Sequence, residues 1–334
     1  MNKKEFFEIL RSIYEETRNL DQCFMIINAQ LFKILPSNLY RYRRASKDSI
    51  EAFENDKFVT VTANKFNDPY DTLITYNPED IKKYLNESIS EELLTDLKCK
   101  AQPLSGSCIL GMFSERLKEL SDLYERQILK CNTTNELADC ILNVIMSDTF
   151  QDGVIAPFKD VAKRYATIGC LCERKDSILM WSHYTDAHKG FLLEYDTVDL
   201  FYTSANNNAF LLPVDYDTLR YNATEMVLSN VLRLLGINMP EWNKFEVLMY
   251  MTKKSEEWAY EKEWRVIRFP KQRNDIHNEV DIFTCKPKAI YYGSNMLDED
   301  REKLHIIATR KQIPEFEMFL DETSLKFSMD YKPV

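Results

Sequence analysis

Two glutamates, spaced two residues apart, form the most distinctive chemical pattern in the chain. They lie in Tyr260–Ile267, a segment whose sequence Y-E-K-E-W-R-V-I is typical of a strand. Since side chains on a strand alternate between its faces, Glu261, Glu263 and Arg265 are expected on one face, with the carboxylates roughly 6 to 7 Å apart. Such a pair favours one ionised and one protonated carboxyl, and it can hold a ribose hydroxyl and stabilise an oxocarbenium-like carbon. The pattern also fits an exposed strand face on which Arg265 and cross-strand partners neutralise the carboxylates.

A second alternating segment, near the start of the chain, combines arginines with tyrosines. Its sequence L-Y-R-Y-R predicts a strand at 38–43, with Arg41 and Arg43 on one face and Tyr40 and Tyr42 on the other. A strand arginine can bind a pyrophosphate or a carboxylate through two hydrogen bonds, and a tyrosine can stack on a base or a nicotinamide ring. A polar edge strand covered by tyrosine rings is the alternative.

Polar, turn-forming residues follow the next predicted strand. The segment N-K-F-N-D-P-Y-D runs from Asn64 to Asp71, and Pro69 ends the strand because proline cannot donate a hydrogen bond to a ladder. Asn67 and Asp68 are candidates for orienting a ligand, since loops on a rigid scaffold often carry sites. They fit equally well an Asx turn, in which the side chain bonds to its own backbone.

A short helix with three ring-bearing residues is predicted at 179–186. Trp181, His183 and Tyr184 lie on it, and the chain then runs through Gly190 into a strand. Gly190 fits a helix C-cap or a close backbone approach. Ligand contact by the three rings is one hypothesis, and a hydrogen-bonded core or cleft role for His183 is the other.

Neither a metal site nor a glycine-rich phosphate loop is expected. His183 and His188 are five residues apart, which is not the spacing of a helical metal pair, and Cys170 and Cys172 lack a second thiol pair at zinc spacing. The chain has seven glycines and contains neither the dinucleotide-binding pattern G-x-G-x-x-G nor a P-loop. Any nucleotide must therefore be held by side chains.

The elements that must position these residues predict an α+β fold with a mixed or antiparallel sheet. Residues 1–36 form a pair of helices that Pro36 ends, and 37–334 form a single domain with a helical insertion at about 77–166. The irregular order of strands and helices argues against a doubly wound parallel sheet. Strands are expected at 38–43, 58–62, 166–172, 190–195, 210–215, 263–268, 290–292 and 316–319, and further helices from about 48, at 223–254 and at 298–311.

Composition predicts a soluble globular protein of the cytoplasm. Of its 334 residues, 45% are apolar and 29% are charged, as in an ordinary packed domain. The net charge of −10 argues against general nucleic-acid binding, which needs a basic face. Eight scattered cysteines fit reduced thiols, and neither a signal peptide nor a membrane-spanning stretch is expected.

Taken together, the short motifs resemble the domain-of-unknown-function 2971 (DUF2971) family, found in bacteria and some phages. The resemblance rests on L-Y-R-Y-R, N-K-F-N-D-P-Y-D, C-x-C, M-W-S-H-Y with H-K-G-F behind it, and W-x-Y-E-K-E-W-R, in that order between Leu39 and Gly293. The family brings no assigned reaction.

A second resemblance, to ADP-ribosyltransferases, rests on an early strand arginine, a polar strand end and a late E-x-E strand. It implies that NAD is the substrate, that Arg41 meets the NAD phosphates or ribose, and that Glu263 is the catalytic glutamate with Glu261 beside it. Thr62 and Asn64 take the second-strand position, where this chain has T-V-T-A-N in place of Ser-Thr-Ser. The further candidates for cofactor contact are Tyr40, Asn67, Asp68, Trp181, His183, Tyr184 and Arg265.

Three functions remain open from the sequence. The leading hypothesis is an NAD-using ADP-ribosyltransferase-like enzyme of the toxin or antiphage type, acting on an unknown protein or nucleic-acid acceptor. A non-catalytic nucleotide- or protein-binding module is the first alternative, favoured if Glu263 is bound by Arg265. A metal-dependent nuclease with Asp68, Asp71, Glu261 and Glu263 as Mg²⁺ ligands is the second.

Overall fold

The computed structural model describes residues 1–17, 20–92, 94–95, 127, 130–234, 244–270 and 278–334. Contacts divide the chain into two compact units. The first comprises Met1–Thr72, Arg164–Leu219 and Met251–Val334, and the second comprises Leu73–Lys163 and Arg220–Tyr250. Parts of the predicted helical stretches, at 18–19, 96–126 and 235–243, lie outside the described residues.

The first unit is built on a large sheet. Its strands are β1 (Asn38–Arg43), β2 (Lys57–Thr62), β3 (Thr167–Cys172), β4 (Phe191–Asp196), β5 (Ala209–Pro213), β8 (Glu263–Arg268), β9 (Val280–Thr284), β10 (Ala289–Tyr292), β11 (Glu315–Leu320) and β12 (Met329–Pro333). The strand order is β12-β11-β10-β4-β1-β3-β2-β9, and β8 pairs with β3 and β5. The β10–β11 pair is parallel and the other pairs of this sheet are antiparallel, so the predicted α+β class with a mixed sheet is confirmed.

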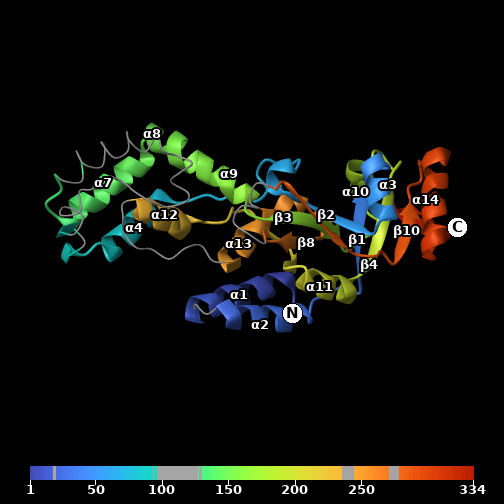
Figure 1. The fold of residues 1–334 in the computed structure, drawn as a ribbon, viewed down its shortest axis with the longest axis horizontal. Coiled ribbons are helices and arrows are strands. Elements are labelled where there is room, and N and C mark those ends of the chain that lie inside the picture. Colours follow the sequence, from blue (N-terminus) through green and yellow to red (C-terminus); the bar gives the residue numbers. More distant parts are fainter. Residues whose placement is uncertain (18–19, 93, 96–126, 128–129, 235–243, 271–277) are drawn as a thin grey trace. The chain divides into compact units, whose positions relative to one another are not determined.

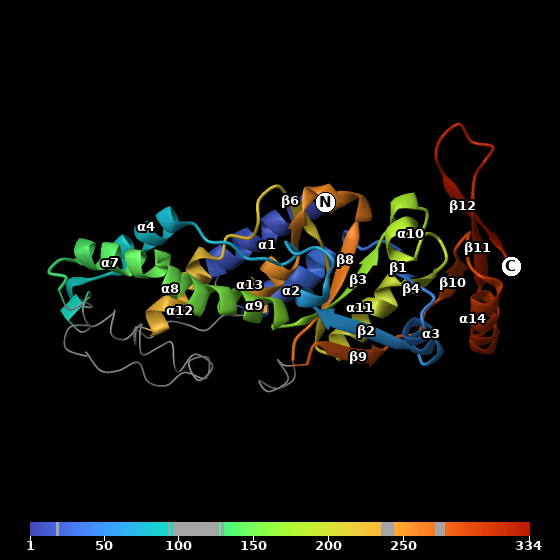
Figure 2. The same ribbon diagram turned by 90° about the horizontal axis from the view of Figure 1, so that it is seen from above.

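Helices cover both sides of this sheet. Those of the first unit are α1 (Lys3–Thr17), α2 (Leu20–Leu31), α3 (Lys47–Glu54), α10 (Ile178–Tyr184), α11 (Thr197–Asn206) and α14 (Asp298–Lys311), with the 3₁₀ turns η1 (Ala63–Lys65) and η4 (Glu256–Glu261). Figure 1 shows α1, α2 and α11 on one side of the strands and α10 on the other, and Figure 2 shows β10, β11 and β12 side by side next to α14.

Local chemistry explains several of these boundaries. The Asp196 side chain accepts hydrogen bonds from the backbone N–H groups of Val198 and Asp199, so it ends β4 and caps α11 in one residue. Helix α14 has acidic residues in its first turn and basic residues in its last, in agreement with the helix dipole. A Cβ atom on Gly190 would lie 2.1 Å from the carbonyl oxygen of Arg43, so only glycine lets β4 begin this close to β1.

Two sequence predictions about the sheet are wrong in detail. The strand expected at 210–215 is interrupted after Pro213, because the next residues form a separate two-stranded parallel sheet of β6 (Asp215–Asp217) and β7 (Lys253–Ser255). The strand expected from Tyr260 begins only at Glu263, since the preceding residues form the 3₁₀ turn η4.

The second unit is described through helices. They are α4 (Pro78–Ser88), α7 (Thr134–Met146), α8 (Asp148–Phe150), the π-helical turn η3 (Gln151–Ile155), α9 (Ala156–Arg164), α12 (Thr224–Leu234) and α13 (Lys244–Met251), of which α9 and α13 each end in the first unit. Asn77 and Thr133 cap α4 and α7 through their side chains, as their sequences indicate. None of the described helices has the length and apolar character that crossing a bilayer requires.

Candidate functional site

A buried lysine joins the two glutamates of the E-x-E pattern. Lys254 lies on β7, and its Nζ is 2.5 Å from Oε2 of Glu261 and 2.8 Å from Oε2 of Glu263. Both glutamates are 3% exposed and Lys254 is 9% exposed. Because both oxygens contact the same nitrogen, the two carboxylates are held close together and away from bulk water.

An arginine completes the charge compensation on the other side of Glu263. Arg265 is fully buried, and its Nε donates to Oε1 of Glu263 at 2.9 Å. Its two terminal nitrogens donate to the two carboxylate oxygens of Asp71 at 2.9 and 2.7 Å, a bidentate pair. We call Asp71, Lys254, Glu261, Glu263 and Arg265 the charge cluster.

A tight turn, and not a shared strand face, brings Glu261 into the charge cluster. Glu261 is the last residue of η4, and Lys262 after it has a left-handed backbone with φ of 47°. The expectation that Glu261 and Glu263 alternate along one strand is therefore wrong. The turn at Lys262 directs both carboxylates to Lys254, so the predicted proximity of the pair is present through a different backbone geometry.

Two tyrosines contact the glutamates at the edge of the charge cluster. The Tyr184 hydroxyl, from the end of α10, donates to Oε1 of Glu261 at 2.6 Å. The Tyr216 hydroxyl, from β6, accepts a hydrogen bond from the backbone N–H of Glu263 at 2.8 Å. Tyr184 is more exposed than the glutamates, so it separates Glu261 from solvent.

The two glutamates are driven toward opposite protonation states. Burial raises the pKa of Glu261, and the neighbouring Glu263 raises it further, more than Lys254 and Tyr184 lower it. Burial also acts to raise the pKa of Glu263, but Arg265 and Lys254 outweigh it and hold that pKa below the usual range. The arrangement therefore favours an ionised Glu263 beside a Glu261 that retains its proton to higher pH.

Arg41 lies on the opposite face of the sheet from Glu263. Tyr40 pairs with Cys172, which pairs with Glu263, so these three side chains share one face. Arg41, next in the chain, therefore projects from the other face. Its guanidinium donates to the carbonyl of Val59 and lies 4.2 Å from the centre of the Phe58 ring. The register separates the arginine and the glutamate that the sequence hypothesis placed in one NAD site.

The predicted loop residues also lie apart from the charge cluster, except for Asp71. The Asp68 side chain accepts from the backbone N–H of Tyr70 at 2.8 Å, which is the Asx turn that the sequence left as an alternative, and Asn67 is exposed. Asn64 donates to Glu279 at 3.0 Å. Thr62 is buried at the end of β2, and its hydroxyl contacts the Asn64 side chain.

The three rings of α10 have three different environments. Tyr184 contacts the charge cluster through its hydrogen bond to Glu261, as described. Trp181 is fully buried in a cluster with Tyr40 and Tyr42, and its Nε1 donates to the carbonyl of Lys175 at 2.7 Å. His183 is exposed. Among the predicted contact residues, Tyr184 and Arg265 thus meet the glutamates directly, whereas Tyr40 and Trp181 form part of a core.

The charge cluster is not arranged as a metal site. Within the part of the chain that the structure describes, no group of three or more His, Cys, Asp or Glu side chains could hold a metal ion. Lys254 and Arg265 lie between the carboxylates, where a Mg²⁺ ion would have to bind. The nuclease hypothesis, which needs these carboxylates as ligands, gains no support from this geometry.

Sequence reasoning missed Lys254 and Tyr216. Lys254 was assigned to the end of a helix, and the pattern around it, M-T-K-K-S, has no strand alternation. It reaches the glutamates because β7 pairs with β6, a contact between segments about 40 residues apart. Two buried carboxylates need a cation nearby, so a buried lysine or arginine beside them could be expected. The sequence does not show which of the 43 lysines and arginines it is.

Comparison with known proteins identifies one family. Residues 180–266 match the model of the family described as a protein of unknown function, DUF2971. No curated protein and no solved structure matches the chain. The matched segment contains Tyr184, Lys254, Glu261, Glu263 and Arg265, so most of the charge cluster lies inside the family region.

Proposed function

We propose that this chain, whose residues 180–266 match the DUF2971 family model, is an NAD-using ADP-ribosyltransferase-like enzyme that acts with the Glu261–Glu263 pair. The observation that carries the proposal is the contact of both carboxylates with one Lys254 nitrogen, in an environment that raises the pKa of Glu261 and lowers that of Glu263. The acceptor class is not part of the proposal.

The spacing of the carboxylates supports chemistry at a glycosidic bond. Their Oε2 atoms cannot be further apart than the sum of two short hydrogen bonds through Lys254. Carboxyl pairs about 5 Å apart act on an oxocarbenium-like sugar carbon without room for a water molecule between them. The bond between ribose and nicotinamide in NAD is a glycosidic bond of this kind.

The two glutamates would take different roles. As the bond between the ribose carbon and nicotinamide breaks, its electron pair moves to the nicotinamide nitrogen and positive charge develops on the sugar. Ionised Glu263 stabilises that charge and binds the ribose hydroxyl. Glu261 orients the acceptor and takes the proton that the acceptor loses on attack, because its raised pKa makes it the better base of the two.

Arg41 has no part in this proposal. The sheet register directs it away from Glu263, so the diphosphate of NAD would need cations on the face that carries Glu263. Tyr184 is the half-buried residue through which a substrate would approach, because its hydroxyl binds Glu261 from the more exposed side.

Nicotinamide release from NAD is the direct test. We expect wild-type protein to release nicotinamide, measured by chromatography, and Glu263→Gln and Glu261→Gln to lose most of that activity. Glu257→Gln is the matched control, since Glu257 lies exposed on the same turn η4. Intact NAD with wild-type protein and every acceptor tried, together with no NAD binding by calorimetry, would overturn the proposal.

A second candidate function has its own supporting observation. Glu263 is bonded to both Arg265 and Lys254, which is the arrangement expected if the carboxylate is structural and the protein is a nucleotide- or protein-binding module. That function predicts stabilisation by a nucleotide without turnover. In it, Glu263→Gln lowers stability but leaves ligand affinity unchanged.

A further inference from the structure

Three tyrosine rings surround the ammonium group of Lys175. The Nζ atom lies 3.9 Å from the ring centre of Tyr331, 5.3 Å from that of Tyr291 and 5.9 Å from that of Tyr40. These distances are within the range in which the negative face of an aromatic ring attracts a cation. We call the three tyrosines the tyrosine cage.

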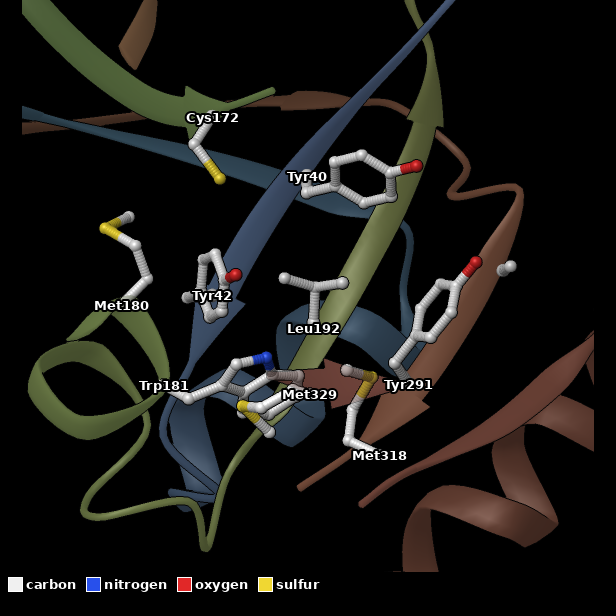
Figure 3. Packing of buried hydrophobic residues seen from close by; sticks show 10 residues of the cluster. Tyr40, Tyr42, Cys172, Met180, Trp181, Leu192, Tyr291, Met318 and Met329 are labelled. Carbon is white, nitrogen blue, oxygen red and sulfur yellow. The ribbon is translucent and has the colours of Figure 1, made fainter. Parts of the chain in front are cut away.

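The cage is held in place by the sheet. Tyr40, Tyr291 and Tyr331 lie on β1, β10 and β12, and each of the two ring contacts among them is edge-to-face, at 79° and 76°. Phe316 stacks behind Tyr291 at 4.8 Å. Figure 3 shows Tyr40 on β1 and Tyr291 on β10, the two strands that flank β4. Because the rings are fixed by packing, the cage does not have to form when a cation binds.

A buried carboxylate increases the negative potential of the cage. Glu194, on β4, is 6% exposed, and its Oε2 accepts a hydrogen bond from the Tyr291 hydroxyl at 2.6 Å. Among the described residues, Glu194 forms an ion pair with Lys288, whose Nζ is half-exposed and 3.8 Å away. The negative charge of Glu194 therefore lies directly behind one wall of the cage and is only partly neutralised from solvent.

The lysine in the cage is held by the rings and not by an ion pair with any described residue. The neighbouring pair of Arg174 and Asp176 is exposed to solvent. The Lys175 backbone is fixed, since its carbonyl accepts from Trp181, but its side chain contacts the cage through rings alone. A flexible side chain on a fixed backbone can leave the cage without disturbing the sheet.

We propose that the tyrosine cage is a binding site for a trimethylammonium group, and that the Lys175 side chain occupies it in the absence of ligand. A trimethylammonium ion fits better than a primary ammonium group, because its methyl groups contact the rings and it gives up less hydration on entering the cage. The group has two natural sources: a free quaternary amine such as choline, or a trimethylated lysine on a protein. The site shares no residue with the charge cluster, so this proposal does not depend on the proposed use of NAD.

Calorimetry with tetramethylammonium tests the site. We expect Lys175→Ala to bind it about ten-fold more tightly than wild-type protein, since the internal competitor is gone, and the added change Tyr331→Leu to abolish binding. Tyr331 is 38% exposed on an edge strand, so its replacement leaves the fold intact, which circular dichroism verifies. Equal affinity of wild-type protein and Lys175→Ala, or binding that survives Tyr331→Leu, would overturn the proposal.

Matched ligands test whether the cage recognises the positive charge or only the shape of the ligand, and whether the ligand is a free amine or a methylated protein. The neutral isostere 3,3-dimethylbutanol must bind Lys175→Ala at least about ten-fold more weakly than choline, because the rings select a cation; equal binding would show an apolar pocket and contradict the proposal. Tighter binding of a trimethyl-lysine peptide than of choline assigns the site to a protein partner, and the reverse assigns it to a free amine.

Discussion

The two faces of the central sheet bury charge in different ways. On the face that carries Glu263, two cations and three carboxylates neutralise one another through direct bonds. On the other face, Arg41 is 8% exposed and forms no ion pair with any described residue. Its guanidinium instead contacts the backbone carbonyl of Val59 and the Phe58 ring. Burial and Arg43 lower the pKa of Arg41 to about 9.

This difference shows how much an alternating pattern of charged residues can predict about a strand. The segments around Arg41 and Glu263 both alternate in sequence, and in each the alternation correctly separates the faces where a strand forms. Alternation says nothing about which charges are compensated. The charge cluster depends on every one of its members, because removal of one leaves others buried and unpaired, whereas the environment of Arg41 holds no such dependent charge.

The largest expected effect is the loss of Arg265. We expect Arg265→Met to lower the free energy of unfolding by about 3–5 kcal/mol, since Asp71 and Glu263 are then buried without their main partner. Urea denaturation measures this. Arg174→Met, which removes an exposed ion pair, is the control and is expected to change it by less than about 1 kcal/mol. A similar small change for both variants would show that the charge cluster is not a coupled network.

The next effect is a pH dependence of opposite sign for the two glutamates. The pKa of Glu263 is lowered by folding, so the unfolded chain binds more protons below about pH 5 and acidification favours unfolding. The pKa of Glu261 is raised by folding, so this residue stabilises the protein at low pH and that stabilisation is lost as the pH rises above about 5.

Denaturation of matched variants as a function of pH resolves the two contributions. Relative to wild-type protein, Glu263→Gln is expected to lose less stability between about pH 5 and pH 3, and Glu261→Gln to lose less between about pH 5 and pH 8. Slopes that change in the same direction for both variants would contradict the assignment of unlike protonation states.

The smallest effect is expected on the arginine face. Arg41→Met removes a buried charge and one hydrogen bond but leaves no buried carboxylate without its partner. The free energy of unfolding should therefore remain within about 1 kcal/mol of wild type. A loss as large as that of Arg265→Met would mean that Arg41 belongs to an ion network, and the contrast between the two faces would fail.

Much of the sheet was predictable, because its central strands are apolar, regular and bounded by clear turn residues. The bounds of β1 and α14 agree with the prediction at both ends, and β8 covers the expected range 263–268, although the extended segment expected before it at 260–262 is a turn. The edge strands β9 and β12 were missed, since both are largely exposed and lack a continuous buried face. Helix α11 was missed although Asp196 is a good N-cap, because its β-branched and aromatic residues favour a strand.

The candidate site was predictable only in its local part. Glu261, Glu263 and Arg265 come together as residues of one short motif, whereas the Tyr184 hydroxyl reaches Glu261 from a segment 77 residues away. The place of Lys254 depends on the pairing of β6 with β7, and the separation of Arg41 from Glu263 depends on the register across β3. Both are contacts between distant segments, on which a local pattern carries no information.

The central claim is that the pKa values of Glu261 and Glu263 are shifted in opposite directions within one buried pair, and carboxyl ¹³C NMR tests it most directly. In protein labelled at the glutamate side-chain carboxyls, the two resonances are identified by their loss in Glu261→Gln and Glu263→Gln. We predict that Glu261 titrates above the ordinary value for glutamate, about 4.3, and that Glu263 stays ionised to the lowest pH at which the protein is folded. Titration of both carboxyls together within the ordinary range would contradict the account.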